Sequence, residues 1–216
     1  MQVTEQTMEH LPFIFTIFFL TLGPLKIIPL FYRLTATATE NYRKQAAIRS
    51  TLIATIIVIL LGLIGRNIIH NWGVSRSSLI TSGGLLLLIA ALKVLSQFTI
   101  PKSSKNLPSS PPEEEVEHIV ISPLVIPGII TPYGVVAILI TTGNAGRNIP
   151  LQLSILGLLL VMMLLNYVGM IFAQPIIKRL QISTLLMIGW VFAVMQAALA
   201  IQFIADGLRG FRIFPS

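Results

Sequence analysis

The sequence predicts an all-α, polytopic membrane protein with six transmembrane helices. Of its 216 residues, 54% are hydrophobic and only 11% are charged, whereas a soluble domain carries about 25% charged residues. The apolar residues also gather into segments near the roughly 17–25 residues that a helix needs to cross a bilayer. Six such segments follow one another, at about 11–32, 46–65, 77–98, 119–142, 150–173 and 183–205. Membrane lipid is therefore a partner that the composition itself implies.

Charge and residue usage exclude several classes of function. The net charge is +7, but the basic residues lie in short loops between apolar segments, so they indicate anchoring at a membrane surface and not nucleic-acid binding. Cysteine is absent, which excludes disulfides and thiolate sites. All eight acidic residues lie at termini, in loops or at a helix end, so no carboxylate proton relay is expected within the membrane. No metalloprotease, nucleophile–base or phosphate-loop pattern occurs, so we expect neither an enzyme nor a bound metal or cofactor.

The first segment contains a break. Gly23, Pro24, Lys26 and Pro29 interrupt its otherwise apolar run. Each proline removes a backbone donor and clashes with the preceding turn, which frees carbonyl groups of that turn. In hydrocarbon, a freed polar group is costly unless protein or water satisfies it. The sequence therefore predicts a broken first helix that faces a neighbouring helix or a wet cavity.

The fourth segment carries a matching break. Its interrupting residues are Pro123, Pro127, Gly128, Thr131, Pro132 and Gly134. Two breaks at corresponding positions are typical of a binding site, in which the ends of half-helices direct their dipoles at a small ligand. The alternative is that these prolines are ordinary, because proline is commoner in membrane helices than in soluble ones.

The two halves of the chain resemble each other. Residues 23–26 align with 131–134, residues 62–64 with 169–171 and residues 91–93 with 200–202, at offsets of 108, 107 and 109. Because each half would contain three spans, an odd number, the second half must enter the membrane from the opposite side. We therefore expect an inverted 3+3 repeat with broken helices 1 and 4.

A polar stretch separates the two halves. It contains four prolines and a carboxylate cluster at Glu113, Glu114, Glu115 and Glu117, which make it too polar to bury. The cluster is interpreted as a solvated charge run, with a cation site as the alternative. The predicted organisation is a first three-helix repeat at 1–98, a cytoplasmic linker at 99–118 and a second repeat at 119–216.

Lysine and arginine residues predict the orientation. The loops after the first, third and fifth segments hold eight of them, while the opposite side holds five. Cytoplasmic loops carry the excess of positive charge in membrane proteins. We therefore place those three loops in the cytoplasm and both termini outside.

Lys26 is the residue of the first segment that points most directly to a function. A lysine at a helix centre costs about 2.5–3.5 kcal/mol on insertion scales. One interpretation is that Lys26 faces a cavity, where it would pair with a substrate carboxylate or replace a coupling ion. The other is that it snorkels toward the interface near Arg33, about 10 Å away along the helix.

Five further residues in the apolar segments are secondary candidates for a binding site: Ser82, Gly83, Gly84, Gln196 and Gln202. For the hydroxyl and amide groups, helix packing is the ordinary role, because they commonly bond to their own helix or to a neighbour. The two glycines are expected to let the third segment approach the broken helix closely.

The two breaks resemble those of the MarC family of six-span membrane proteins. The family pattern Asn-Pro-x-Gly-x-x-Pro falls on residues 23–29, with Gly23 at the Asn position and Lys26 at the Gly position. The pattern Pro-x-x-x-Pro followed by Gly-Pro falls on residues 123–132, with Thr131 at the Gly position. Residues 82–84 and 202–207 are also similar to family positions. The resemblance covers nearly the whole chain and implies a six-span protein of the plasma membrane, in bacteria the inner membrane, that transports neutral amino acids.

The resemblance and the paired breaks together favour a secondary transporter that works by alternating access. Its expected substrates are small neutral solutes, amino acids such as glycine or alanine. The substrate carboxylate would meet a half-helix N-terminus or Lys26, and the substrate ammonium would meet freed carbonyls of the partner break. H⁺ or Na⁺ would serve as coupling ion. Three alternatives stay open: a non-transporting assembly or regulatory protein, an exporter of other small metabolites or drugs, and a passive channel.

Overall fold

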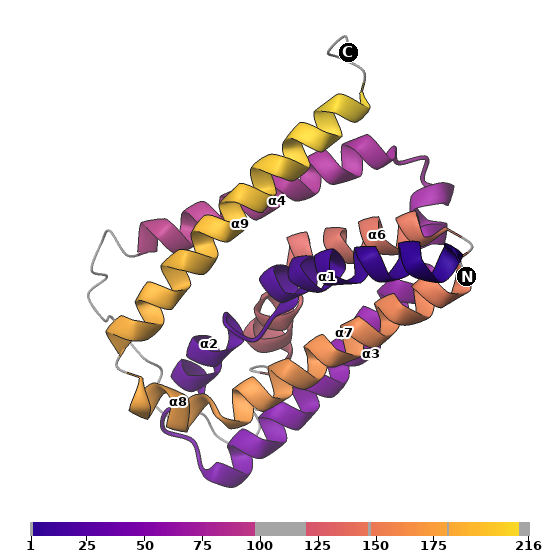
Figure 1. Cartoon of the computed structure of the whole chain (residues 1–216). Coiled ribbons are helices and arrows are strands. Elements are labelled where there is room, and N and C mark those ends of the chain that lie inside the picture. The colour runs from indigo at the N-terminus through magenta and orange to yellow at the C-terminus, as the bar shows by residue number, and fades with distance from the viewer. Residues whose placement is uncertain (1, 98–119, 147, 181, 212–216) are drawn as a thin grey trace.

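The computed structural model describes residues 2–97, 120–146, 148–180 and 182–211. Within these ranges every regular element is a helix, which confirms the all-α prediction there (Figure 1). The elements are α1 (Gln2–Leu22), α2 (Ile27–Leu34), α3 (Glu40–Asn71), α4 (Arg76–Gln97), the π-helix η2 (Val120–Ile129), α6 (Pro132–Ala145), α7 (Ile149–Ile171), α8 (Ala173–Arg179) and α9 (Ile182–Gly210). The predicted linker at 99–118 and its carboxylate cluster lie outside the described residues.

Five stretches of the described residues are long and apolar enough to cross a membrane. They are Leu11–Leu34, Glu40–Gly65, Arg76–Ser96, Ile149–Ile171 and Met187–Gly210. The prediction of six spanning helices is therefore met only in part. The fourth predicted segment consists of η2 and α6, which are 10 and 14 residues long, and neither is of membrane length by itself.

Both predicted helix breaks are present. The first is the turn at residues 23–26 between α1 and α2. Pro29 does not break α2, because it occupies the first turn, where a backbone N–H has no partner within the helix. The second break follows η2, where Thr131 is extended, with φ −100° and ψ 152°. Pro132 favours that conformation, because a residue before proline is pushed out of the helical region.

The helices pack in pairs that bring the two halves of the chain together. α4 and α9 lie side by side along one edge of the molecule, and α3 and α7 lie side by side along another (Figure 1). α1 and α6 contact each other, and α6 also packs on α3 and α4. The largest fully buried side chains include Phe18, Phe31, Leu124, Ile138 and Leu159. The core therefore surrounds the two breaks.

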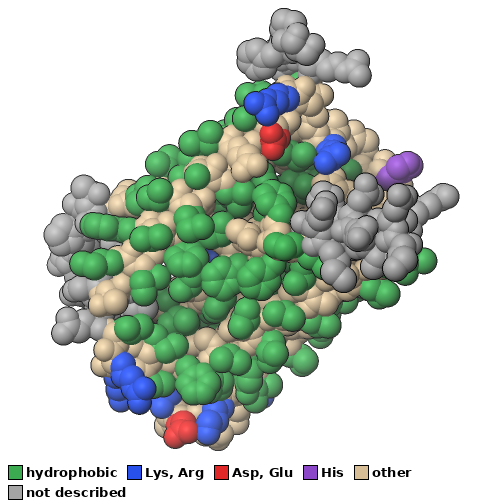
Figure 2. All heavy atoms as spheres, in the orientation of Figure 1, with side chains coloured by type: hydrophobic (Ala, Val, Ile, Leu, Met, Phe, Trp, Pro, Cys, Tyr) green, Lys and Arg blue, Asp and Glu red, His purple; other side chains and the backbone are tan. Residues whose placement is uncertain are grey.

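Charged and apolar side chains separate along the molecule. Figure 2 shows hydrophobic side chains over the middle of the visible face, with lysine and arginine gathered toward two opposite ends. Large apolar side chains on the spanning helices are exposed, among them Leu52, Ile56, Leu92, Leu164 and Val194. An apolar belt between two charged ends is the surface that a bilayer covers. The structure is thus that of a polytopic membrane protein.

The two ends of the described chain lie toward the same end of the bundle. The start of α1 and the end of α9 both lie away from α2 and α8, as Figure 1 shows. The opposite end is formed by α2, α8 and the contact between them.

Candidate functional site

The first break is shaped around Gly23. Its backbone N–H donates to the carbonyl of Phe19 at 3.0 Å, which closes the last turn of α1. A Cβ added to Gly23 would lie 2.0 Å from that carbonyl oxygen, so a side chain does not fit there. The chain then turns at Pro24, whose carbonyl accepts from the N–H groups of Ile27 and Ile28, both at 3.1 Å. This turn redirects the backbone from α1 into α2.

Three consecutive carbonyls at the end of α1 accept hydrogen bonds from distant side chains. Leu20 would normally accept from the residue four positions on, but that residue is Pro24, which has no N–H. The carbonyl of Leu20 accepts instead from Nε2 of Gln196 on α9. The carbonyl of Leu22 accepts from Nδ2 of Asn166 on α7 at 2.7 Å. Helices far apart in the sequence therefore meet at this break.

The middle carbonyl of the three connects the two breaks directly. Oγ1 of Thr131 donates to the carbonyl of Thr21 at 3.1 Å. The same Oγ1 accepts from the N–H of Gly134 at 3.1 Å, which caps the start of α6. Gly134 is buried beneath Leu22, because a Cβ added to it would lie 2.5 Å from Cδ2 of that leucine. The start of α6 thus lies against the end of α1.

Lys26 turns back toward the break. Its Nζ donates to the carbonyl of Thr21 and, at 3.1 Å, to the hydroxyl of Tyr133. Nζ also lies 4.8 Å from the centre of the Tyr133 ring, where the electron-rich face attracts a cation. The ion pairs of the described residues, Glu40 with Lys44 and Asp206 with Arg209, do not include Lys26. Lys26 therefore bonds to the break itself, and its position beside a substrate cavity stays a prediction.

Asn166 holds an acceptor that the described residues leave without a hydrogen bond. Its side chain is only 1% exposed, and its Nδ2 donates to the carbonyls of Leu22 and Met162, both at 2.7 Å. Oδ1 of the same amide has no hydrogen-bond partner among the described residues. A buried polar atom without a partner is costly, so a water or a ligand donor is its natural complement.

The structure brings six of the residues predicted for the site together and leaves others apart. Around the two breaks lie Gly23, Pro24, Lys26, Thr131, Gly134 and Gln196. Pro132 starts α6 beside them, although its side chain is exposed. The side chains of Pro29, Pro127, Ser82 and Gln202 are exposed and make no contact with the cluster that the structure records.

The two glycines of α4 have different neighbours. A Cβ on Gly83 would lie 2.4 Å from Cγ1 of Val136, so this residue does pack against the second broken helix, as predicted. A Cβ on Gly84 would lie 2.8 Å from the carbonyl oxygen of Ala200 on α9. Gly84 therefore serves the contact between α4 and α9.

Two members of the cluster, Tyr133 and Asn166, were not predicted for the site. Asn166 is an amide in the middle of an apolar span, where bonding between helices is the ordinary role of such a group. Tyr133 lies between Pro132 and Gly134, inside the predicted break, but a tyrosine in an apolar segment carries no sign of its partner. Their roles depend on which helices meet, and the sequence pattern does not contain that information.

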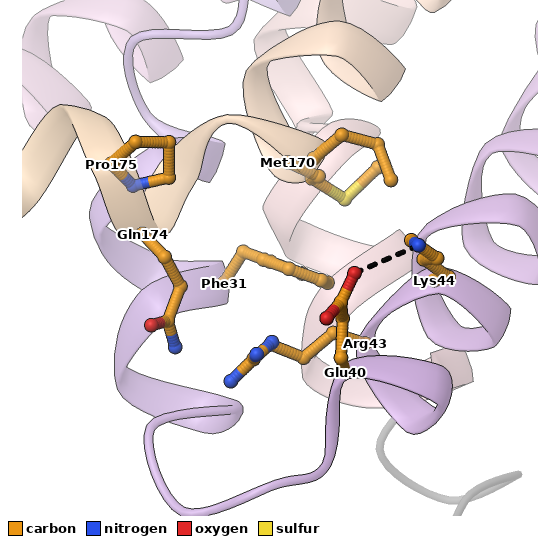
Figure 3. Close-up of a pocket in the computed structure, with 8 residues that line it drawn as sticks. Phe31, Glu40, Arg43, Lys44, Met170, Gln174 and Pro175 are labelled. Carbon is orange, nitrogen blue, oxygen red and sulfur yellow. Dashed lines mark ion pairs between the residues drawn. The ribbon is translucent and has the colours of Figure 1, made fainter.

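A pocket of about 200 Å³ opens at the end of the bundle formed by α2 and α8. Its lining includes Phe31, Arg43, Lys44, Met170 and Gln174 (Figure 3). Nζ of Lys44 pairs with Oε1 of Glu40 at 2.8 Å on one side of it. Figure 3 shows the side chains of Arg43 and Gln174 reaching toward the space below Phe31. The lining of the pocket therefore combines apolar side chains with charged and polar ones.

Apolar helices of membrane length, two facing breaks and a buried polar cluster define a polytopic integral membrane protein. The chain belongs to the MarC family: the model of the MarC family integral membrane proteins matches residues 8–212. A UPF0056 membrane protein of Archaeoglobus fulgidus is 30% identical over 194 residues, which cover 90% of this chain and 90% of the relative. The UPF0056 membrane protein YhcE of Escherichia coli is 24% identical and covers 97% of both chains. No solved structure matches the chain.

Proposed function

We propose that this protein is a secondary transporter of small neutral solutes, with amino acids such as glycine or alanine as substrates. The observation that carries the proposal is the meeting of two broken helices around a buried polar cluster. In secondary transporters, discontinuous helices of two repeats supply the substrate site in this way. The proposed location is the plasma membrane, or the inner membrane of a bacterium, with both termini outside.

The chemistry of the cluster fits a zwitterion. The ammonium group of Lys26 and the N-terminus of α6 offer positive charge to a carboxylate. Oδ1 of Asn166 offers an acceptor to a substrate ammonium group. The carbonyls at the end of α1 already accept from Gln196, Thr131 and Asn166, so they are not free to bind a substrate ammonium group. Asn166 therefore takes over that role in the proposal.

An inverted repeat supports alternating access. If α1–α2, α3 and α4 correspond to η2–α6, α7 and α9, then corresponding elements pack on each other: α1 on α6, α3 on α7 and α4 on α9. Crosswise contacts are also reciprocal, because α3 packs on α6 as α7 packs on α1. Such reciprocity is expected of two halves related by a twofold axis in the membrane plane. Rocking of one half against the other would open the breaks to each side in turn.

The pocket at the basic end supports a path from that side. Met170, which lines it, lies one helical turn from Asn166 on α7, about 6 Å along the axis. Phe31, also in its lining, lies on α2, which starts directly after Lys26. A solute that enters the pocket would therefore reach the cluster by a path along α7 and α2.

A non-transporting membrane protein is the second candidate function, and one observation favours it. All three carbonyls freed at the end of α1 are satisfied by side chains of the protein itself, so the break also works as a packing device. This candidate predicts that no amino acid changes the thermal unfolding of the purified protein. The transporter predicts stabilisation by its substrate.

Reconstitution into liposomes tests the proposal. Labelled alanine and glycine are offered to wild type, to Lys26→Ala and to Lys93→Ala, a control on the exposed face of α4. Proton gradients, sodium gradients and counterflow supply the driving forces. The proposal predicts saturable uptake by wild type and the control, which unlabelled substrate competes away, and reduced uptake by Lys26→Ala. Unsaturable flux would indicate a passive channel, and absence of uptake under all three conditions would contradict amino acid transport.

A further inference from the structure

Lys26 differs from every other donor at the end of α1. Gln196, Asn166 and Thr131 donate from neutral groups to the carbonyls of residues 20–22. Nζ of Lys26 belongs to an amine that protonation makes positive, and it shares the carbonyl of Thr21 with the Thr131 hydroxyl. A positive charge is favourable at this place, because the C-terminal end of a helix carries a partial negative charge.

Oxygen atoms and an aromatic face surround this ammonium group. The contacts that the structure records are the Thr21 carbonyl, the Tyr133 hydroxyl at 3.1 Å and the Tyr133 ring at 4.8 Å. No carboxylate of the described residues pairs with it. The positive charge is therefore balanced by dipoles and by a ring, which is how a protein holds a small monovalent cation at a broken helix.

We propose that the ammonium group of Lys26 is a tethered cation that fills a monovalent cation site at the end of α1. The site would be completed by the Thr21 carbonyl and the Tyr133 hydroxyl. The wild-type protein then has no need of Na⁺ at this position. Removing the side chain opens the site to Na⁺ or to a small alkylammonium ion. As a statement about the coupling ion, this inference rests on the proposed transport function, but the cation site itself is tested without transport.

Thermal unfolding of the purified full chain in detergent is the test. Trp72 and Trp190 supply the fluorescence signal. Wild type, Lys26→Ala, Lys26→Met and Lys93→Ala are compared in choline chloride, sodium chloride and methylammonium chloride at equal ionic strength. Lys26→Ala leaves space for a cation, whereas Lys26→Met keeps an apolar chain of similar length in that space. Lys93 is the matched control, because it is an exposed lysine on another spanning helix.

The proposal predicts cation dependence in one variant only. The unfolding temperature of wild type and of Lys93→Ala should be equal in the three salts. That of Lys26→Ala should be lower in choline chloride and should rise saturably, by about 3 °C or more, with sodium or methylammonium. Lys26→Met should be destabilised and should not respond. Saturable stabilisation of wild type by sodium, or a Lys26→Ala protein that ignores both cations, would overturn the proposal.

Two further readings keep the test decisive. If Lys26→Ala is not recovered in plain buffer, it is purified with sodium or methylammonium present throughout; recovery there supports the proposal, and failure in every cation overturns it. Uptake assays separate the inference from the proposed function. If wild type takes up no solute while the unfolding temperature of Lys26→Ala depends on the cation, transport is refuted and the tethered cation is supported. If wild type transports solute while the unfolding temperature of Lys26→Ala does not depend on the cation, transport is supported and the tethered cation is refuted.

Discussion

Asn166 contributes to both the packing of the break and the chemistry proposed for it. Its amide satisfies the carbonyl of Leu22 on a helix more than 100 residues away in the chain, while its own oxygen stays open. One side chain therefore ties α7 to the end of α1. The same side chain carries a buried acceptor one residue along α1 from the Thr21 carbonyl, to which Lys26 and Thr131 donate.

Replacing Asn166 by leucine should destabilise the protein. The substitution roughly conserves volume but leaves the Leu22 carbonyl without its donor, at a cost of about 1–3 kcal/mol in the free energy of unfolding. Thermal unfolding in detergent measures the effect, with Asn144→Leu on the exposed face of α6 as the control. Equal unfolding temperatures for the two variants would show that the amide does not hold the break.

The positions of the two breaks could be predicted from the sequence. Which side chains bond to the carbonyls of the first break could not. Pro24 and the Thr131–Pro132 pair act locally, because proline changes hydrogen bonding and conformation within a turn of itself. The donors Thr131, Asn166 and Gln196 lie 110, 144 and 176 residues from the carbonyls that they satisfy. Which of the embedded amides reaches which carbonyl depends on helix packing, so Asn166 and Tyr133 were missed while Ser82 and Gln202 were included.

Among the elements, α4 and α9 form the closest helix pair. Small residues line the contact: a Cβ on Gly84 would lie 2.8 Å from the Ala200 oxygen and 2.9 Å from the Ile204 nitrogen, and Gly207 faces Thr81 in the same way. Lipid tails are as apolar as leucine, so helices in a membrane associate through close van der Waals packing at such small residues. The pair is therefore held by its glycines.

A methyl group at Gly84 should separate the two helices. Gly84→Ala places a Cβ against backbone atoms that cannot move independently, and such overpacking costs about 1–3 kcal/mol. Gly157→Ala on α7 is the matched control, because a Cβ there meets nothing within 4 Å and alanine favours the helix. The expected result is a lower unfolding temperature for Gly84→Ala alone. A Gly84→Ala protein as stable as the control would contradict the close packing.

The number of spanning elements shows where sequence patterns were insufficient at this scale. Hydropathy located all of the long helices, because length and composition decide membrane crossing. In the fourth segment, the break at residues 130–131 divides the apolar run into η2 and α6. The run is therefore continuous in hydropathy but not in backbone structure. The short helix α8 was not predicted, since seven residues give too little periodicity to recognise.

For the whole molecule, the excess of lysine and arginine in the loops after the first, third and fifth segments predicts an orientation in the membrane. The absence of cysteine makes the chain a background for single-cysteine labelling. Cysteine at the exposed Thr37, between α2 and α3, should react with a membrane-impermeant maleimide only after cells are opened. Cysteine at the exposed Asn71, at the end of α3, should react in intact cells. The reverse pattern would show that the basic end faces outward.

Restoring both helices tests whether the two broken helices form a transport site. In Pro24→Ala with Pro132→Ala, the first change supplies an N–H for the Leu20 carbonyl, and the second removes the bias that keeps Thr131 extended. Counterflow of labelled alanine in liposomes is compared with wild type and with Pro150→Ala, an exposed proline at the start of α7. A transport site at the breaks requires saturable counterflow in wild type and in Pro150→Ala, and its loss in a double variant that still folds cooperatively. Undiminished counterflow in a folded double variant would contradict it.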